Sequence, residues 1–149
     1  MLTIERAVKT DVAAIVAMLA DDPLGASRET PDDLAPYLRS FEDIDADPRQ
    51  YLAVARRHGR VVGTLQLTVL PGLSRKGASR AQVEAVRVHS GERGSGLGTE
   101  LLEWAEHEAR RRGCVLVQLT SDTQREGAHR FYEHLGYQAS HVGFKKRLG

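Results

Sequence analysis

The sequence contains very little cysteine and few aromatic residues. Cys114 is its only cysteine, and Phe, Trp and Tyr together make up 5% of the 149 residues. A single cysteine excludes an internal disulfide and fits a reducing compartment. The six histidines do not combine with Cys114 in a spacing typical of zinc sites, so no metal is expected. A chain of this length buries roughly 68–70% of its unfolded surface, so it can build a core without a cross-link or a metal.

Long apolar runs and a large net charge are also missing. No stretch of 18 apolar residues occurs, and Met1–Arg6 has no apolar signal region. The sequence therefore predicts neither export nor membrane spanning, and a cytoplasmic location is expected. A net charge of +1 gives no long-range attraction to nucleic acids or membranes, so neither is expected as a partner. An anionic ligand must then be held by a local arrangement of groups.

The hydrophobic pattern predicts one α/β domain with a mixed sheet over residues 1–149, in the order β-α-α-β-β-β-α-β-α-β. Asp11 is the expected N-cap of the first helix, Gly59 the turn residue of a hairpin, and Gly113 and Gly136 are expected to end helices. The strand that begins at Cys114 is almost wholly apolar, which predicts burial on both of its faces. The expected strands are 2–8, 51–57, 60–70, 81–88, 114–120 and 137–146, and the expected helices begin at about 11, 31, 99 and 126.

A glycine-rich loop joins the strand 81–88 to the helix that follows it. It reads Arg93-Gly94-Ser95-Gly96-Leu97-Gly98. A helix start offers unpaired N–H groups and a positive dipole end, and glycines let a phosphate approach them. The pattern therefore predicts a pyrophosphate-bearing ligand. The spacing fits neither a Walker loop nor a dinucleotide fingerprint. A glycine turn that binds nothing and a nucleotide-binding protein of another fold remain as alternatives.

This loop resembles the Gln/Arg-x-x-Gly-x-Gly/Ala motif of the GCN5-related N-acetyltransferases (the GNAT family). A second segment, Ala128-His-Arg-Phe-Tyr-Glu-His-Leu-Gly-Tyr137, is similar to the family's Ala-x-x-Phe-Tyr-x-x-x-Gly-Phe signature. With the order of elements, the resemblance covers nearly the whole chain. It implies the N-acetyltransferase fold, acetyl-CoA as co-substrate, and direct transfer of the acetyl group to a primary amine. Arg125 stands where many members carry Asn, so the contribution of that Asn is in doubt here.

The resemblance also implies a set of site residues. Glu84 is the expected general base and Tyr132 the expected acid that protonates the departing thiolate. The alternatives are a cross-strand salt bridge for Glu84 and aromatic packing for Tyr132. Cys114 is expected to be a small core residue and not an acyl-carrying nucleophile. The residues expected to bind the co-substrate are Val86, Arg87, Val88, Arg93, Gly94, Ser95, Gly96, Leu97, Gly98, Thr99, Ala128 and Phe131, with solvent exposure as the alternative for Arg87.

The acceptor amine is less defined. Residues 101–112 and 128–144 also resemble the bacterial aminoalkylphosphonate N-acetyltransferases, which favours a small-molecule amine. A protein or peptide amine is the alternative acceptor, and an acyl-CoA sensor or non-catalytic partner module is the alternative function. A homodimer is implied only by the family. Arginines in 21–49 and 71–80 suit an anionic acceptor, whereas acidic residues in the first of these stretches suit a cationic one.

Overall fold

The computed structural model describes all 149 residues, and their contacts divide the chain into two compact units, 1–118 and 119–149. The first unit is built on a five-stranded sheet in the order β1-β2-β3-β4-β5. Neighbouring strands are antiparallel except β4 and β5, which are parallel. The mixed sheet of the expected α/β fold is therefore confirmed. The strands are β1 (Leu2–Arg6), β2 (Gln50–Arg57), β3 (Arg60–Leu70), β4 (Ser79–Val88) and β5 (Cys114–Gln118).

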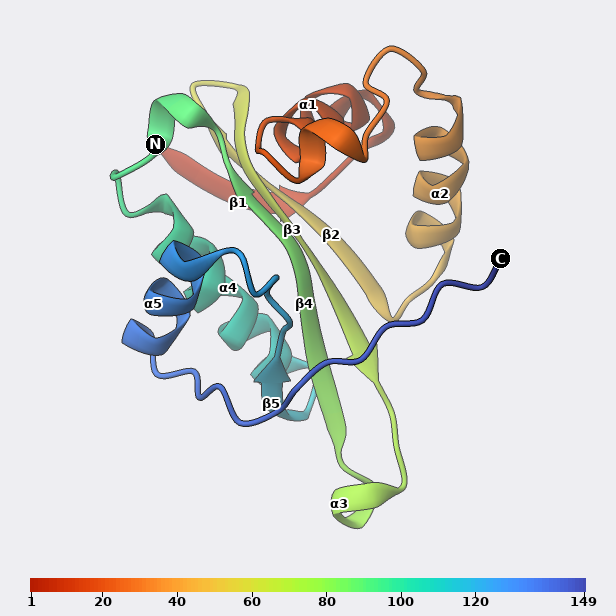
Figure 1. Cartoon of the computed structure of the whole chain (residues 1–149), viewed down its shortest axis with the longest axis vertical. Coiled ribbons are helices and arrows are strands. Elements are labelled where there is room, and N and C mark those ends of the chain that lie inside the picture. The colour runs from red at the N-terminus through yellow and green to blue at the C-terminus, as the bar shows by residue number, and fades with distance from the viewer. The chain divides into compact units, whose positions relative to one another are not determined.

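Helices cover both faces of this sheet (Figure 1). On one face lie α1 (Val12–Ala20) and α2 (Ala35–Ala46), and on the other lies α4 (Leu97–Arg111). Gly63 of β3 allows α4 to approach closely, because a Cβ there would lie 3.1 Å from Leu101 Cδ1 and 3.3 Å from Leu97 Cδ2. The core is apolar on both sides, and Leu65, Leu67, Leu101 and Leu102 are fully buried.

The turns follow the glycine chemistry that the sequence predicts. His58 and Gly59 both have positive φ, 53° and 76°, and join β2 to β3. Gly113 (φ 79°) follows the end of α4. The basic stretch between β3 and β4 is not wholly a loop, because α3 (Ser74–Gly77) forms a single turn there. Arg75 and Lys76 in that turn have left-handed φ values of 57° and 62°.

Asp11 precedes α1 as expected, but its side chain does not cap that helix. Its Oδ2 instead accepts hydrogen bonds from the Val8 N–H (2.8 Å) and from Arg56 Nη2 (2.6 Å). The expected capping role is therefore wrong, because the partly buried Arg56 of β2 and the N–H of Val8 occupy the carboxylate. The acid joins β1, β2 and α1 at the edge of the core.

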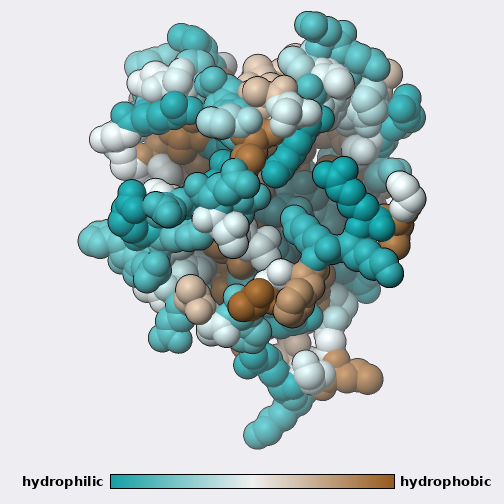
Figure 2. Space-filling model, in the orientation of Figure 1, coloured by the Kyte–Doolittle hydropathy of each residue, from teal (hydrophilic) through white to brown (hydrophobic).

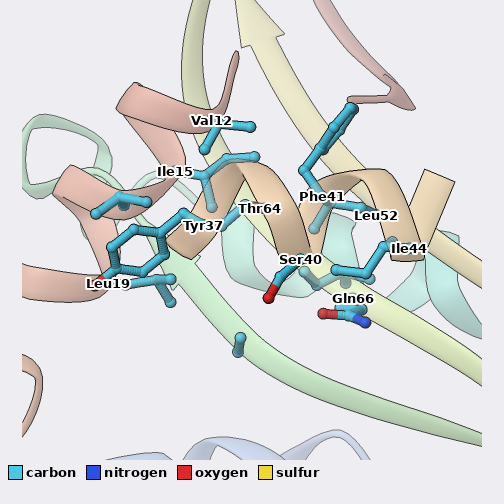
Figure 3. A pocket seen from close by; sticks show the side chains of 13 residues that line it. Val12, Ile15, Leu19, Tyr37, Ser40, Phe41, Ile44, Leu52, Thr64 and Gln66 are labelled. Carbon is cyan, nitrogen blue, oxygen red and sulfur yellow. The ribbon is translucent and has the colours of Figure 1, made fainter. Parts of the chain in front are cut away.

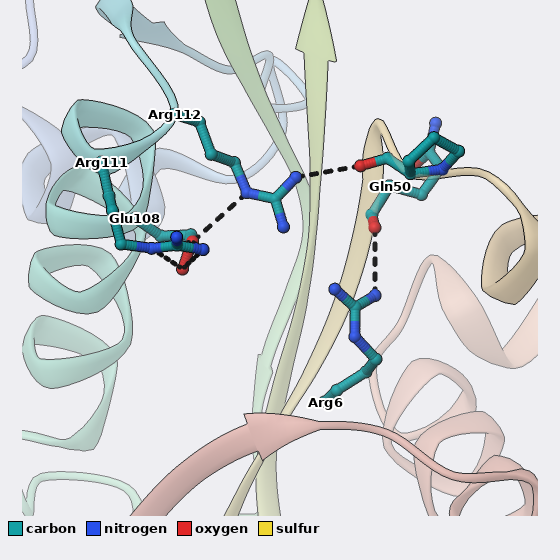
Figure 4. Close-up of polar contacts among 6 residues, drawn as sticks. Arg6, Gln50, Glu108, Arg111 and Arg112 are labelled. Carbon is teal, nitrogen blue, oxygen red and sulfur yellow. Dashed lines mark hydrogen bonds and ion pairs between the residues drawn. The ribbon is translucent and has the colours of Figure 1, made fainter.

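A polar cluster fixes the C-terminal end of α4 (Figure 4). Glu108 accepts hydrogen bonds from Arg111 Nη2 (2.6 Å) and Arg112 Nε (3.2 Å). Arg112 also donates to the carbonyl of Pro48 (3.0 Å), and Arg6 donates to the carbonyl of Gln50 (3.2 Å). The cluster thus links α4 to the chain segment that enters β2.

Burial opposes ionisation of Glu108, but the hydrogen bonds and charges of Arg111 and Arg112 outweigh it and lower the pKa of that carboxyl. Beside the cluster, the Arg6 guanidinium lies 4.1 Å from the centre of the Tyr51 ring. The same ring meets Trp104 edge to face at 4.9 Å. The Tyr51 ring therefore adds an aromatic contact between β2 and the middle of α4, beside the charged cluster.

The second unit contains α5 (Glu126–His134), close to the expected helix. Gly136 (φ 94°) ends it, with the Gly136 N–H donating to Glu133 O and the Tyr137 N–H to Tyr132 O, both at 3.0 Å. These two bonds form a Schellman motif. The domain boundaries 1–149 stay a prediction.

The expected final strand, 137–146, does not form, and residues 137–149 have no regular secondary structure. The apolar side chains of Val142 and Phe144 are 78% and 93% exposed, so burial does not drive this segment into a sheet. With no sixth strand, β5 is the edge of the sheet. The expectation that β5 is buried on both faces is also wrong, because Val115 is 62% exposed.

On the face seen in Figure 2, hydrophobic side chains are scattered among hydrophilic ones and form no continuous patch. None of the helices combines the length and the apolar character needed to cross a bilayer.

Candidate active site

Strand β4 carries a bulge in its middle. Thr64 pairs with Arg87 and Gln66 with Glu84, so Leu65 alone stands opposite Ala85 and Val86. Ala85 has a φ of 54°, which a non-glycine residue rarely adopts. A bulge bends its strand and interrupts the alternation of side chains, and bulges are frequent beside active sites.

The second half of β4 has no partner on its β5 side. Parallel pairing runs from Ser79↔Cys114 to Gln82↔Gln118, where β5 ends, and residues 83–88 continue alone. On the other side the His89 N–H donates to Val62 O at 2.8 Å. Because N–H directions alternate along a strand, we infer that the Val86 and Val88 N–H groups point away from β3, towards the edge of β4 that β5 does not pair with.

The glycine loop follows directly. Ser90–Glu92 forms a short turn of 3-10 helix, and Ser95 donates from both its N–H (3.1 Å) and its hydroxyl (2.5 Å) to the carbonyl of Glu92. Gly94 and Gly96 have φ values of 82° and 85°. No atom lies within 4 Å of where a Cβ would stand at either position. Backbone conformation and not packing therefore requires these glycines, and the space in front of them is open.

Helix α4 begins at Leu97, two residues earlier than expected, with Gly96 as its N-cap. Leu97, Gly98 and Thr99 thus form its first turn. No side chain caps this end. The first N–H groups of a helix have no partner within it, and they carry the positive end of its dipole. The loop and the helix start together present donors suited to an anion.

Two arginines near the loop pair with aspartates that follow α1. Arg87 Nε lies 3.4 Å from Asp22 Oδ2, and its Nη1 donates to the carbonyl of Val86 at 2.9 Å. Arg93 Nη2 lies 3.9 Å from Asp21 Oδ2, and both side chains are 62% exposed. Arg87 is therefore not the solvent-exposed strand residue of the alternative interpretation, whereas Arg93 is exposed beside the glycines.

Glu84 is exposed and pairs across strands with Gln66, so the two side chains share a face of the sheet. It forms no ion pair, and the alternative of a cross-strand salt bridge is wrong. Val83 and Ala85 do not share a face of the sheet, although they are two residues apart on one strand. Val83 is fully buried, but Ala85 lines the same cavity as Gln66 because the bulge interrupts the alternation.

That cavity has a volume of about 180 Å³ and lies between α1, α2 and the sheet (Figure 3). Apart from Tyr37, Ser40, Thr64 and Gln66, its lining side chains are hydrocarbon. None of them carries a charge. They are Val12, Ile15, Val16, Leu19, Tyr37, Ser40, Phe41, Ile44, Leu52, Thr64, Leu65, Gln66 and Ala85.

The remaining expected site residues, Ala128, Phe131 and Tyr132, lie on α5 in the second unit. The Tyr132 ring meets Phe131 edge to face at 5.2 Å and Tyr137 at 6.0 Å. Arg125, at the Asn position of the family motif, is the N-cap of α5 and offers no side-chain cap. Its backbone N–H donates to Asp122 O at 2.9 Å.

Cys114 opens β5 as a partly buried side chain. Burial raises the pKa of its thiol, and nearby Arg112 offsets this only in part. The thiolate, which is the nucleophilic form, is therefore less populated than in an ordinary cysteine.

Three features of the site escape sequence reasoning. The bulge at Ala85 depends on the register between β3 and β4, and a short alternating strand carries no signal of it. Asp22 lies in the irregular stretch after α1, and its ion pair with Arg87 of β4 joins residues that are far apart in the sequence. The cavity depends on how α1 and α2 pack against the sheet. The glycine loop, by contrast, is visible in the sequence, because its glycines cluster between an expected strand and an expected helix.

Comparison with known proteins agrees with this geometry. Residues 13–137 match the model of the acetyltransferase (GNAT) family. The chain is 37% identical over 102 residues to the aminoalkylphosphonate N-acetyltransferase of Salmonella typhimurium, a match that covers 68% of this chain and 66% of that enzyme. It is 37% identical over 81 residues to the glucosamine 6-phosphate N-acetyltransferase of Trypanosoma brucei brucei, which covers 54% of this chain and 53% of that enzyme. The chain thus spans slightly under two thirds and about half of these relatives.

A solved structure is similar over nearly the full length. The crystal structure of a transcriptional regulator from Bacillus halodurans C-125 has a TM-score of 0.96 and 45% identity, and the match covers 99% of this chain and 100% of that one. The family model spans well over half of the chain and includes the glycine loop, the bulged strand and α5. This chain therefore belongs to the GNAT family of acetyltransferases, whose co-substrate is acetyl-CoA.

Proposed function

We propose that this chain transfers the acetyl group of acetyl-CoA to the primary amine of a small molecule by direct attack. The observation that carries this proposal is the open half of β4, residues 83–88, which leads straight into the glycine loop. One continuous segment thereby offers an oxyanion site, an anion site and a candidate base.

The glycine loop fits the pyrophosphate of the co-substrate. Gly94 and Gly96 leave open space, and the first turn of α4 supplies N–H donors at the positive end of a helix dipole. Arg93 adds an exposed guanidinium that can contact a phosphate. The side chain of Leu97 is only 1% exposed. It packs the start of α4 against the sheet, and we assign it no direct contact with phosphate.

The Val86 and Val88 N–H groups are the proposed donors to the carbonyl oxygen of the thioester. Negative charge develops on this oxygen as the amine attacks, and fixed N–H donors stabilise it without reorganisation. Arg87, held by Asp22 and the Val86 carbonyl, keeps this part of the strand in place.

Glu84 is the proposed base. An alkylammonium with a pKa near ~10.4 is mostly charged at neutral pH and must lose a proton before it attacks. Glu84 is exposed, immediately precedes the bulge, and can accept that proton directly or through water.

Tyr132 is the proposed acid. A phenol can give a proton to the departing thiolate as the C–S bond breaks, provided that the site assists the transfer. Phe131 and Ala128 are the proposed apolar contacts of the pantetheine arm. The raised pKa of Cys114 disfavours an acyl-cysteine intermediate and supports direct attack.

A small acceptor is supported by the relatives and by the cavity. The two enzymes named above acetylate, by their names, an aminoalkylphosphonate and glucosamine 6-phosphate. A partly open cavity of about 180 Å³ suits part of a small molecule better than an extended peptide.

A second candidate function is an acyl-CoA sensor without turnover. The observation that favours it is the 45% identity to the solved transcriptional regulator. Acetyl-CoA would then bind and stabilise the fold, but no amine would release free thiol.

The first test measures thiol release from acetyl-CoA across a panel of amino acids, polyamines, aminoglycosides, aminoalkylphosphonates, arylalkylamines and lysine peptides. Tyr132→Phe is expected to lower the transfer rate at least ~tenfold with little change in acetyl-CoA affinity. Tyr137→Phe, which removes a neighbouring hydroxyl, is the matched control and should transfer normally. Equal rates in Tyr132→Phe and the native chain would remove Tyr132 from the mechanism. Acetyl-CoA binding without turnover on any amine would favour the sensor.

The second test replaces the base. Glu84→Gln is expected to lower kcat/KM about 100-fold at neutral pH. The deficit should shrink as the pH rises towards 9, because more of the amine is then already neutral. Glu103→Gln, an exposed glutamate of α4, controls for the change of charge. A deficit that stays constant with pH would assign Glu84 a structural role.

A further inference from the structure

The cavity beneath α1 and α2 is large and apolar. Its volume of about 180 Å³ exceeds the ~150 Å³ of an engineered apolar cavity that binds benzene. The methyl of an acetyl group fills only a small part of such a space. The cavity therefore has room for a group of about six carbons.

The lining of the cavity adjoins the proposed base. Ala85, the bulged residue, lines it, and the next residue towards the N-terminus is Glu84. Gln66 also lines it and shares a face with Glu84. A molecule seated in the cavity thus lies near the candidate base, on the face of the sheet that carries α1 and α2 and not α4 (Figure 1).

The polar groups at the cavity suit an amine and not an anion. Gln66 Nε2 donates to Gln50 Oε1 at 2.9 Å, which leaves the Gln66 side-chain oxygen to accept from an ammonium. No Arg, Lys or His lines the cavity. The Tyr37 hydroxyl donates to Glu29 Oε1 (2.9 Å) and accepts from the Thr30 N–H (2.8 Å), so the loop before α2 fixes this ring as a wall.

We propose that the acceptor is a primary amine linked through one or two carbons to an apolar group of about six carbons, and that this group fills the cavity. The proposal rests on the acetyl transfer proposed above and names its substrate class. An N–C bond forms and the C–S bond breaks, Glu84 takes a proton from the amine, and Tyr132 gives one to the sulfur. Amine and acetyl-CoA become amide and free thiol.

The test compares kcat/KM for benzylamine and phenethylamine with that for ethanolamine and 2-aminoethylphosphonate. The arylalkylamines are expected to be preferred at least ~tenfold, the order of discrimination that an apolar pocket gives. Ser40→Phe places a ring in the cavity from α2 and should remove that preference, mainly by lowering kcat/KM for the two arylalkylamines. Ile44→Phe, one helical turn further on, is a second filling variant if the first does not fold. Asp43→Phe, on the exposed side of α2, is the matched control and should keep the preference.

Binding provides a readout that does not depend on transfer. Benzylamine should raise the melting temperature of the native chain and of Asp43→Phe, but not of Ser40→Phe. This result supports the cavity assignment even if no amine is acetylated, in which case only the proposed function fails. Equal kcat/KM for all four amines, without benzylamine binding, would overturn the inference. A second donor, butyryl-CoA, tests whether the cavity holds the acyl chain instead. If Ser40→Phe no longer uses butyryl-CoA but still prefers the arylalkylamines, the acyl chain occupies the cavity and the inference is overturned.

Discussion

Arg56 joins two carboxylates that differ in burial. Its Nη2 lies 2.6 Å from Asp11 Oδ2 and its Nε 2.6 Å from Glu5 Oε1. The side chain of Asp11 is 6% exposed, whereas that of Glu5 is 52% exposed. The hydrogen bond that Arg56 donates to Asp11, followed by the one that it donates to Glu5, raises the pKa of Arg56. Because both ion pairs share Arg56, their contributions to stability can be compared directly.

Asp11→Asn is expected to lower the free energy of unfolding by ~1–3 kcal/mol, because it weakens a buried charge-assisted bond and the bond from the Val8 N–H. Glu5→Gln should lower it by less than about 1 kcal/mol, because solvent screens the exposed pair. Urea denaturation of the two variants measures the difference. Equal losses would mean that burial does not set the strength of these bonds.

The sequence places Asp11 correctly but not its partners. A short acidic residue before an apolar helix is typical of an N-cap. Arg56 is 45 residues away, and nothing in the local pattern shows that it will compete for the carboxylate. Tertiary contacts of this kind overrule local preference.

At the scale of elements, the glycine loop depends on backbone conformation. Gly94 and Gly96 have positive φ and open surroundings. A side chain at Gly96 would therefore not touch the protein but would enter the space where we propose that the phosphates bind. Asp and Asn have nearly the same shape and both tolerate left-handed φ better than other residues. Comparing Gly96→Asp with Gly96→Asn therefore separates the effect of a negative charge from the effect of a larger side chain.

Gly96→Asp is expected to weaken acetyl-CoA binding at least about tenfold more than Gly96→Asn, because only the aspartate repels a phosphate. Calorimetric titration measures both dissociation constants. S-acetylpantetheine, which lacks the pyrophosphate, should not distinguish the two variants. Matching affinities of the variants for acetyl-CoA would place the phosphates elsewhere.

The sequence predicts elements well where glycine or periodicity marks them. The β2–β3 hairpin at His58-Gly59 and the helix ends at Gly113 and Gly136 are confirmed. The strand expected over 137–146 is not, because alternation alone does not supply a partner strand. The bulge at Ala85 is invisible for a related reason, since it arises from the register with β3.

At the scale of the whole molecule, the Glu108 cluster couples stability to pH. The pKa of Glu108 is lowered in the folded chain, so folding favours the ionised form. Its contribution is therefore fully present above the ordinary value of 4.5. It is lost as the pH falls through the lowered folded-state value.

Glu108→Gln is expected to cost ~1–3 kcal/mol of unfolding free energy at pH 7, because hydrogen bonds to two arginines are weakened. The difference between the variant and the native chain should shrink once the pH falls below about 4.5. Chemical denaturation at a series of pH values measures it. A difference independent of pH would assign the loss to packing and not to charge.

In the proposed reaction, the two faces of the sheet bind different substrates. Helices α1 and α2 and the cavity lie on one face, and α4, which the glycine loop opens, lies on the other. Substitutions on the cavity-lining sides of α1 and α2 can therefore change which amine is accepted while the acetyl-CoA site stays intact. Relatives that all use acetyl-CoA can then differ in the amine that they acetylate. A laboratory library aimed at new acceptors can be confined to these two helices.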